Sequence, residues 1–127
     1  MPTSIFISHV YEDRGARDAI RRWATKGLLG ANVVVTGETE DHRQGGSRAI
    51  RGHLNPKLRG ASAVVVLVGN DTHNHAWVAY EAQHALSNRK RVVAVRIPNT
   101  TGAVPQAVAH LDLVAMNPTA VRAALAT

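Results

Sequence analysis

The chain has 127 residues, 45% of them hydrophobic, with no cysteine and a formal net charge of +6. This length predicts one domain over residues 1–127, and the missing cysteines exclude disulfides, zinc–thiolate sites, iron–sulfur clusters and a cysteine nucleophile. No apolar run reaches the ~18 residues of a membrane span, so we expect a cytoplasmic protein without a membrane partner. The five aromatic residues are too scattered to form a stacking surface for single-stranded nucleic acid, so we do not expect nucleic acid as a partner.

The first half of the chain predicts two strands, each followed by a helix. Residues 4–8 form a short β-rich run, and residues 13–28 carry apolar side chains at helical spacing after a capping aspartate. Residues 32–35 are β-branched and apolar, which is typical of a strand. Residues 47–58 predict a second helix, which Pro56 is expected to kink or shorten.

The second half continues the alternation. Residues 61–68 (ASAVVVLV) are apolar almost throughout, which indicates a strand buried on both faces. A third helix is expected from residue 74 or 75 through residue 85, and a fourth strand over residues 91–97. A short strand within residues 110–116 and a helix over residues 118–126 complete the pattern.

This alternation predicts an α/β fold, a flavodoxin-like three-layer sandwich with a four- or five-stranded parallel sheet in the order 2-1-3-4-5. In that order a ligand crevice lies above the carboxyl ends of strands one and three. The expected crevice residues therefore run from Ser8 to Asp13 and from Gly69 to Trp77. Glu81 follows Trp77 by four residues, so both lie on one helical face toward the crevice.

The polar residues of these loops have ordinary interpretations beside the functional ones. Phosphate-loop, dinucleotide-binding and nucleophile-elbow motifs are absent, which excludes three common classes of α/β enzyme. His73 and His75 suggest a metal, but no third ligand is evident nearby and we expect none. Ser8 is expected either to contact a substrate phosphate or ribose or to cap its turn, and Trp77 either to anchor the core or to stack. Residues 36–46 are expected to form a loop, over the crevice or simply on the surface.

Four segments in order resemble TIR domains. Phe6-Ile7-Ser8-His9 with Glu12-Asp13 resembles their opening motif, and Gly46-Ser47 resembles the entry to their second helix. Residues 64–69 with Thr72, then residues 77–81 (Trp-Val-Ala-Tyr-Glu), resemble their third strand and Trp-x-x-x-Glu helix. With residues 93–98 (VAVRIP) added, the pattern is most similar to the prokaryotic TIR-like proteins of the Thoeris anti-phage system.

The resemblance implies an enzyme that cleaves the nicotinamide–ribose bond of NAD⁺ and makes an ADP-ribose-derived signal, linear or cyclic. It implies Glu81 as the catalytic carboxylate, a homo-oligomer or assembly through TIR–TIR contacts, and a separate effector protein that senses the product. NAD⁺ is then a substrate, and no cofactor or metal is expected. The crevice residues expected to bind it are Ser8, His9, Tyr11, Asn70, Thr72 and Trp77.

Two other interpretations stay open. A non-catalytic TIR-like interaction module would keep the fold and bind no NAD⁺. A nucleic-acid-binding or nuclease protein would account for the net charge of +6 and the histidine-rich loop, and its affinity for nucleic acid would fall steeply with salt.

The histidines predict a pH dependence of substrate binding. Five of the seven lie in or beside the crevice loops and the helix that bears Glu81: His9, His42, His73, His75 and His84. Their protonation would add positive charge around a site that holds a diphosphate, so we expect NAD⁺ affinity to rise as the pH falls from about 8 to 6.

Overall fold

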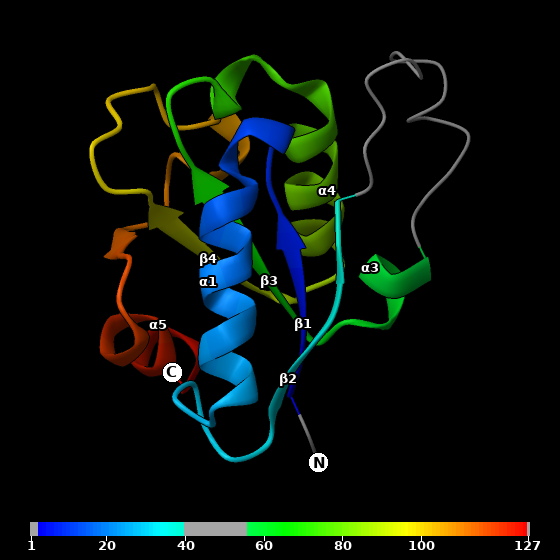
Figure 1. Ribbon diagram of the computed structural model, residues 1–127. Coiled ribbons are helices and arrows are strands. Elements are labelled where there is room, and N and C mark those ends of the chain that lie inside the picture. The colour runs from blue at the N-terminus through cyan, green and yellow to red at the C-terminus, as the bar shows by residue number, and fades with distance from the viewer. Residues whose placement is uncertain (1–2, 40–55, 127) are drawn as a thin grey trace.

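The computed structural model describes residues 3–39 and 56–126. Five parallel strands form one sheet in the order β2-β1-β3-β4-β5 (Figure 1). The strands are β1 (Thr3–Ser8), β2 (Val33–Glu38), β3 (Ala63–Val68), β4 (Arg91–Arg96) and β5 (Leu113–Ala115). The predicted flavodoxin-like α/β fold and its strand order are confirmed, and β1 and β3 lie side by side as the crevice argument requires.

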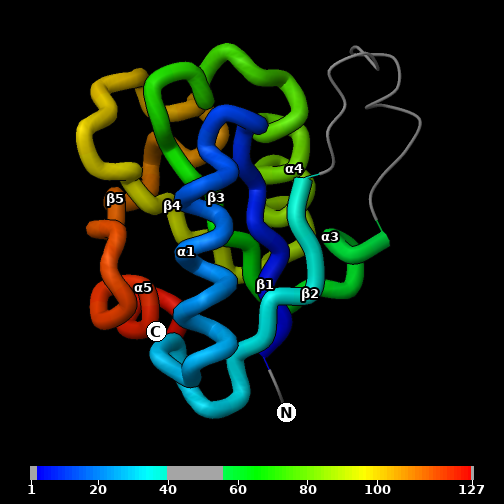
Figure 2. The backbone as a smooth tube through the Cα atoms, viewed as in Figure 1, coloured from blue at the N-terminus to red at the C-terminus, as the bar shows by residue number. Residues whose placement is uncertain are grey.

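Helices cover both faces of the sheet (Figures 1 and 2). Side chains of α1 (Arg14–Thr25) and α5 (Pro118–Ala126) pack on one face, and those of α3 (Pro56–Gly60) and α4 (Ala76–Ser87) pack on the other. Single-turn 3-10 helices follow three of the strands: η1 (Tyr11–Asp13), η2 (Thr72–Asn74) and η3 (Gln106–Val108). Within the described ranges, no helix combines the length and apolar character needed to cross a bilayer.

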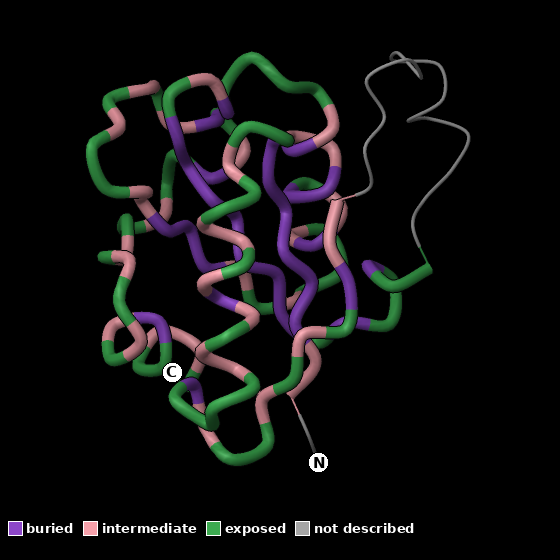
Figure 3. Tube along the Cα trace, viewed as in Figure 1, coloured by how far each residue is buried: buried purple, intermediate pink, exposed green. Residues whose placement is uncertain are grey.

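The continuous apolar run of β3 reflects burial on both faces. All six of its residues are buried. Its even-numbered side chains join the core cluster beneath α3 and α4, and its odd-numbered side chains join the cluster beneath α1 and α5. Figure 3 shows the same result, with the buried part of the trace concentrated in the central strands. A strand between two layers has no solvent face, so it shows no polar alternation.

Some boundaries differ from the sequence prediction. Helix α1 ends at Thr25 because Gly27 takes a left-handed φ of 75°, so Leu28 lies beyond the helix and is 44% exposed. Pro56 is the first residue of α3, a position that proline favours, and the remainder of the helix predicted over residues 47–58 lies outside the described residues together with the Gly46-Ser47 motif.

Strand β2 is longer than predicted and contains a bulge. It continues to Glu38, so residues 36–38 of the expected loop are strand, while residues 40–46 lie outside the described residues. Val35 pairs with Ile5 and Gly37 pairs with Phe6, which leaves Thr36 as an extra residue. Because strand side chains alternate between faces, one extra residue reverses the alternation beyond it. The bulge therefore decides which sheet face the residues after Thr36 present, and these residues contribute to the site described next.

Candidate active site

A buried carboxylate lies at the carboxyl end of β1. Glu81, in the middle of α4, is only 4% exposed. Its Oε1 accepts hydrogen bonds from Ser8 Oγ at 2.8 Å and from Thr39 Oγ1 at 2.6 Å. Burial of a carboxylate is costly unless hydrogen bonds replace its water, and bonds to an ionised oxygen are short and strong. The three residues come from three elements, so the fold assembles this cluster.

Ser8 has a different contact from either expected one. It is the last residue of β1, is fully buried and faces α4, as Phe6 does two residues earlier. Its hydroxyl donates to Glu81. The sequence reasoning therefore placed Ser8 correctly at the crevice but missed its partner, and a direct contact of Ser8 with substrate stays a prediction.

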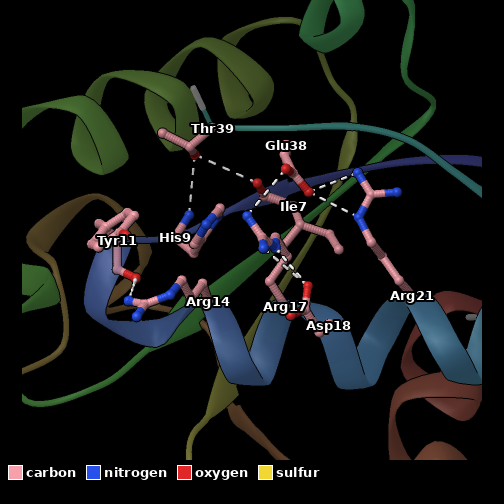
Figure 4. Close-up of polar contacts among 9 residues, drawn as sticks. All are labelled: Ile7, His9, Tyr11, Arg14, Arg17, Asp18, Arg21, Glu38 and Thr39. Carbon is pink, nitrogen blue, oxygen red and sulfur yellow. Dashed lines mark hydrogen bonds and ion pairs between the residues drawn. The ribbon is translucent and has the colours of Figure 1, made fainter. Parts of the chain in front are cut away.

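Thr39 is the site residue that sequence reasoning missed altogether. Its N–H donates to the Ile7 carbonyl at 2.9 Å, and its Oγ1 accepts from the His9 N–H at 3.1 Å (Figure 4). The same hydroxyl donates to Glu81. Thr39 belongs to a stretch that has the composition of a polar loop, and the bulge that turns it toward α4 has no sequence signal that we recognise.

Glu38, the residue before Thr39, points the opposite way and fastens β2 to α1. Arg17 Nη1 lies 3.1 Å from Glu38 Oε1, and Arg21 donates through Nε at 2.8 Å and Nη2 at 2.6 Å to Oε2 (Figure 4). Two guanidinium groups on one carboxylate give a directional, charge-assisted clamp. The end of β2 is thus held from both faces of the sheet, by α1 through Glu38 and by α4 through Thr39.

His9 carries a buried ring whose charged neighbours Arg17 and Glu38 belong to the clamp on the α1 side of the sheet. It is 4% exposed, and its Nδ1 has no hydrogen-bond partner in the part of the chain that the structure describes. Burial lowers the pKa of His9, and Arg17 acts in the same direction, while the Ile7 carbonyl and Glu38 oppose them. An unsatisfied buried nitrogen is costly, and a contact between His9 and a substrate stays a prediction.

The remaining predicted residues lie along the two crevice loops. Tyr11 is 47% exposed, with the Arg14 guanidinium 4.3 Å from its ring centroid. Asn70 is exposed and accepts the Thr101 N–H through Oδ1 at 2.9 Å. Trp77 is half-buried and belongs to neither core cluster of the described residues, and both of its expected roles stay predictions.

Thr72 supports its loop from within. It is fully buried, its Oγ1 accepts the Gly69 N–H at 2.8 Å, and its hydroxyl lies 3.2 Å from the Leu67 carbonyl. These bonds close the turn that follows β3. The Thr72 hydroxyl therefore stabilises its own loop, and a contact between Thr72 and substrate stays a prediction.

Acidic and histidine side chains from the two crevice loops meet one another. The side chains of Glu12, Asp71 and His75 each offer one atom that could ligate a metal, and these atoms all lie within 4.8 Å of one another. His75 Nε2 is 3.0 Å from Asp71 Oδ2, and Asn74 donates to Asp71 Oδ1 at 2.6 Å. These two bonds lower the pKa of Asp71. The sequence reasoning missed Glu12 as a neighbour of His75 because it comes from the other loop, and the absence of a metal stays a prediction.

Asp13 lies against Gly69, the residue that follows β3. Its Oδ2 is buried without a hydrogen-bond partner among the described residues, and its carboxylate packs on Gly69. Burial raises the pKa of Asp13, and the Glu12 carboxylate raises it further. The two crevice loops are therefore in direct contact at Asp13 and Gly69.

The structure weakens the predicted pH dependence of substrate binding. Burial lowers the pKa of His84, with Lys90 and Arg59 adding to the effect, and the pKa of His9 is lowered as well. His75 pairs with Asp71, and His42 lies outside the described residues. With lowered pKa values, His9 and His84 take up their protons at lower pH and add less charge between pH 8 and 6, while the rise in NAD⁺ affinity itself stays a prediction.

Comparison with known proteins adds one finding. Residues 6–102 match the family described as Thoeris protein ThsB, TIR-like domain. The matched range includes both crevice loops and Glu81. Among curated proteins, none matches the chain.

Proposed function

Because the chain belongs to the TIR-like domain family of the Thoeris protein ThsB, we propose that it cleaves the nicotinamide–ribose bond of NAD⁺, with Glu81 as the catalytic carboxylate. Family membership supports a role in anti-phage defence alongside other proteins. The observation that carries the enzymatic part of the proposal is the buried Glu81 carboxylate, hydrogen-bonded by Ser8 where β1 and β3 end.

One carboxylate is sufficient for this chemistry. When the bond between ribose C1′ and the pyridinium nitrogen breaks, its electron pair goes to nicotinamide, which leaves as a neutral molecule without a general acid. The ribose becomes an oxocarbenium-like cation, and a fixed carboxylate in a site shielded from water stabilises it, as in glycoside hydrolysis. Water as acceptor gives ADP-ribose and a proton, an internal hydroxyl or adenine nitrogen gives a cyclic form, and a second molecule gives a conjugate.

The crevice loops supply the substrate contacts in this proposal. Tyr11 and Trp77 offer partly exposed rings for stacking on a base or on nicotinamide, and His9 is a further expected contact. The product would act as a signal for a separate effector protein, and assembly through TIR–TIR contacts would bring copies of the chain together.

Nicotinamide release from NAD⁺ tests the proposal. Glu81→Gln keeps the shape of the side chain and removes its charge, so release should fall by about 100-fold or more. Asp112→Asn is the matched control, because Asp112 is exposed and lies outside both crevice loops, and it should match the parent protein. Release that survives Glu81→Gln would contradict the assignment. No release by the parent protein in extracts of phage-infected cells would favour the non-catalytic interaction module.

A further inference from the structure

We infer that Thr39 is a positioning residue for Glu81, placed by the bulge at Thr36 so that its hydroxyl holds the carboxylate at the end of β1. The inference rests on the proposed catalytic role of Glu81. It adds a second hydroxyl, from another strand, to the machinery that orients the carboxylate.

The hydroxyl hydrogen of Thr39 is directed to Glu81. Its oxygen accepts the His9 N–H at 3.1 Å, so its own hydrogen is left to donate. Two acceptors lie near it in the described part of the chain, Glu81 Oε1 at 2.6 Å and the Ile7 carbonyl at 3.5 Å. The shorter contact, to a carboxylate, is much the stronger of the two.

The bulge is the reason that Thr39 reaches Glu81. Val33 and Val35 pack against the cluster beneath α1 and α5, so in a regular strand every second residue after them would face the same way. Thr36 interrupts this alternation, and Glu38 instead of Thr39 faces α1. Bulges are frequent beside active sites because they re-aim one side chain.

Thr39 is held before any ligand arrives. Its backbone is anchored by the bond to the Ile7 carbonyl, and its neighbour Glu38 is clamped by Arg17 and Arg21. Ser8, the last residue of β1, and Thr39, the residue after β2, therefore both donate to Oε1 from the ends of adjacent strands. Two donors on the same oxygen hold the carboxylate more firmly than one donor would.

The test compares Thr39→Val, which removes the hydroxyl and keeps the branched shape, with Thr39→Ser, which keeps the hydroxyl. Thr25→Val is the matched control, because Thr25 is exposed at the end of α1 and its hydroxyl bonds only the Arg21 carbonyl among the contacts described. The first measurement is the titration of the Glu81 side-chain carboxyl by carbon-13 NMR in ligand-free protein. The second is the steady-state kinetics of nicotinamide release.

Loss of the Thr39 hydroxyl removes a hydrogen-bond donor from the ionised Glu81 carboxylate and so favours its protonation. Thr39→Val should therefore raise the titration midpoint of Glu81 by about one pH unit relative to the parent protein. Its kcat should fall by about tenfold with KM little changed, while Thr39→Ser and Thr25→Val stay within about threefold of the parent. Overlapping Glu81 titrations in parent and Thr39→Val proteins overturn the inference, as does a Thr39→Ser variant as impaired as Thr39→Val. If the parent protein releases no nicotinamide, the proposed function fails, and the titration still decides whether Thr39 holds Glu81.

Discussion

The contact between the two crevice loops can be tested at Gly69. A Cβ added there would lie 2.5 Å from Asp13 Oδ2 and 2.8 Å from Oδ1, distances that real Cβ atoms do not tolerate. Gly69 has no left-handed φ, so Gly69→Ala is unfavourable because of this overlap and not because of its backbone. Asp13 must move, and because it is the last residue of η1 and directly precedes α1, the clash spreads into the first crevice loop.

Two opposing effects determine how much Gly69→Ala changes the free energy of unfolding. Overpacking of this kind costs about 1–3 kcal/mol, and the reduced freedom of the unfolded chain returns about 0.4–1 kcal/mol. Gly69→Ala alone should therefore lower the free energy of unfolding by about 1–2 kcal/mol. In an Asp13→Ala background the overlapping atoms are gone, so the same substitution should be neutral or stabilising by up to about 1 kcal/mol.

Urea denaturation of the four proteins in this double-mutant cycle gives the coupling energy, which should be about 1–3 kcal/mol. Gly15→Ala is the matched glycine control, since a Cβ there meets nothing within 4 Å, and it should stabilise α1 by about 0.5–1 kcal/mol. If Gly69→Ala and Asp13→Ala are additive to within about 0.5 kcal/mol, the two loops do not meet as described and the crevice geometry is wrong.

Three further variants test burial and charge around the site. Burial and the Glu12 carboxylate raise the Asp13 pKa, so the ionised form of Asp13 disfavours the fold and Asp13→Asn should be more stable than the parent at neutral pH. In urea denaturation at several pH values, this difference should shrink in acid as the parent takes up its proton. Because the His9 pKa is lowered in the folded protein, His9 of the unfolded chain takes up a proton at higher pH, and stability should be lost as the pH falls below about 6.5. His9→Gln should therefore make the pH dependence of the melting temperature shallower. An unchanged slope would show that His9 is not buried as described. Phe6→Ala should cost about 3–5 kcal/mol in urea denaturation, since Phe6 is fully buried in β1, and a loss below about 1 kcal/mol would contradict its place in the core.

The parts of the fold that local pattern specifies were predictable. The six buried residues of β3 form one apolar run, and the alternation of strands and helices restricts the topology enough to give the strand order. The ends of elements were less predictable, because a left-handed Gly27 stops α1 before the apolar spacing does. Helical spacing from Trp77 and the family resemblance both led to Glu81, which the structure buries at the expected edge of the sheet.

The partners of Glu81 were predictable only in part. Ser8 was placed at the crevice because it ends β1, but its bond to a residue 73 positions away is a tertiary contact that spacing does not encode. Thr39 was unpredictable for a different reason. Strand alternation gives a side chain its face, and a bulge changes that face without any change in composition.

The most direct measurement of the central claim is a titration of NAD⁺ into nitrogen-15-labelled Glu81→Gln protein, which keeps the substrate intact, followed by amide chemical shifts. We expect the largest shift changes in residues 8–13 and 69–77, at the carboxyl ends of β1 and β3, and in α4 around residue 81. Shift changes confined to α5 and β5, or none with NAD⁺ at millimolar concentration, would contradict the claim that this crevice is a nucleotide site.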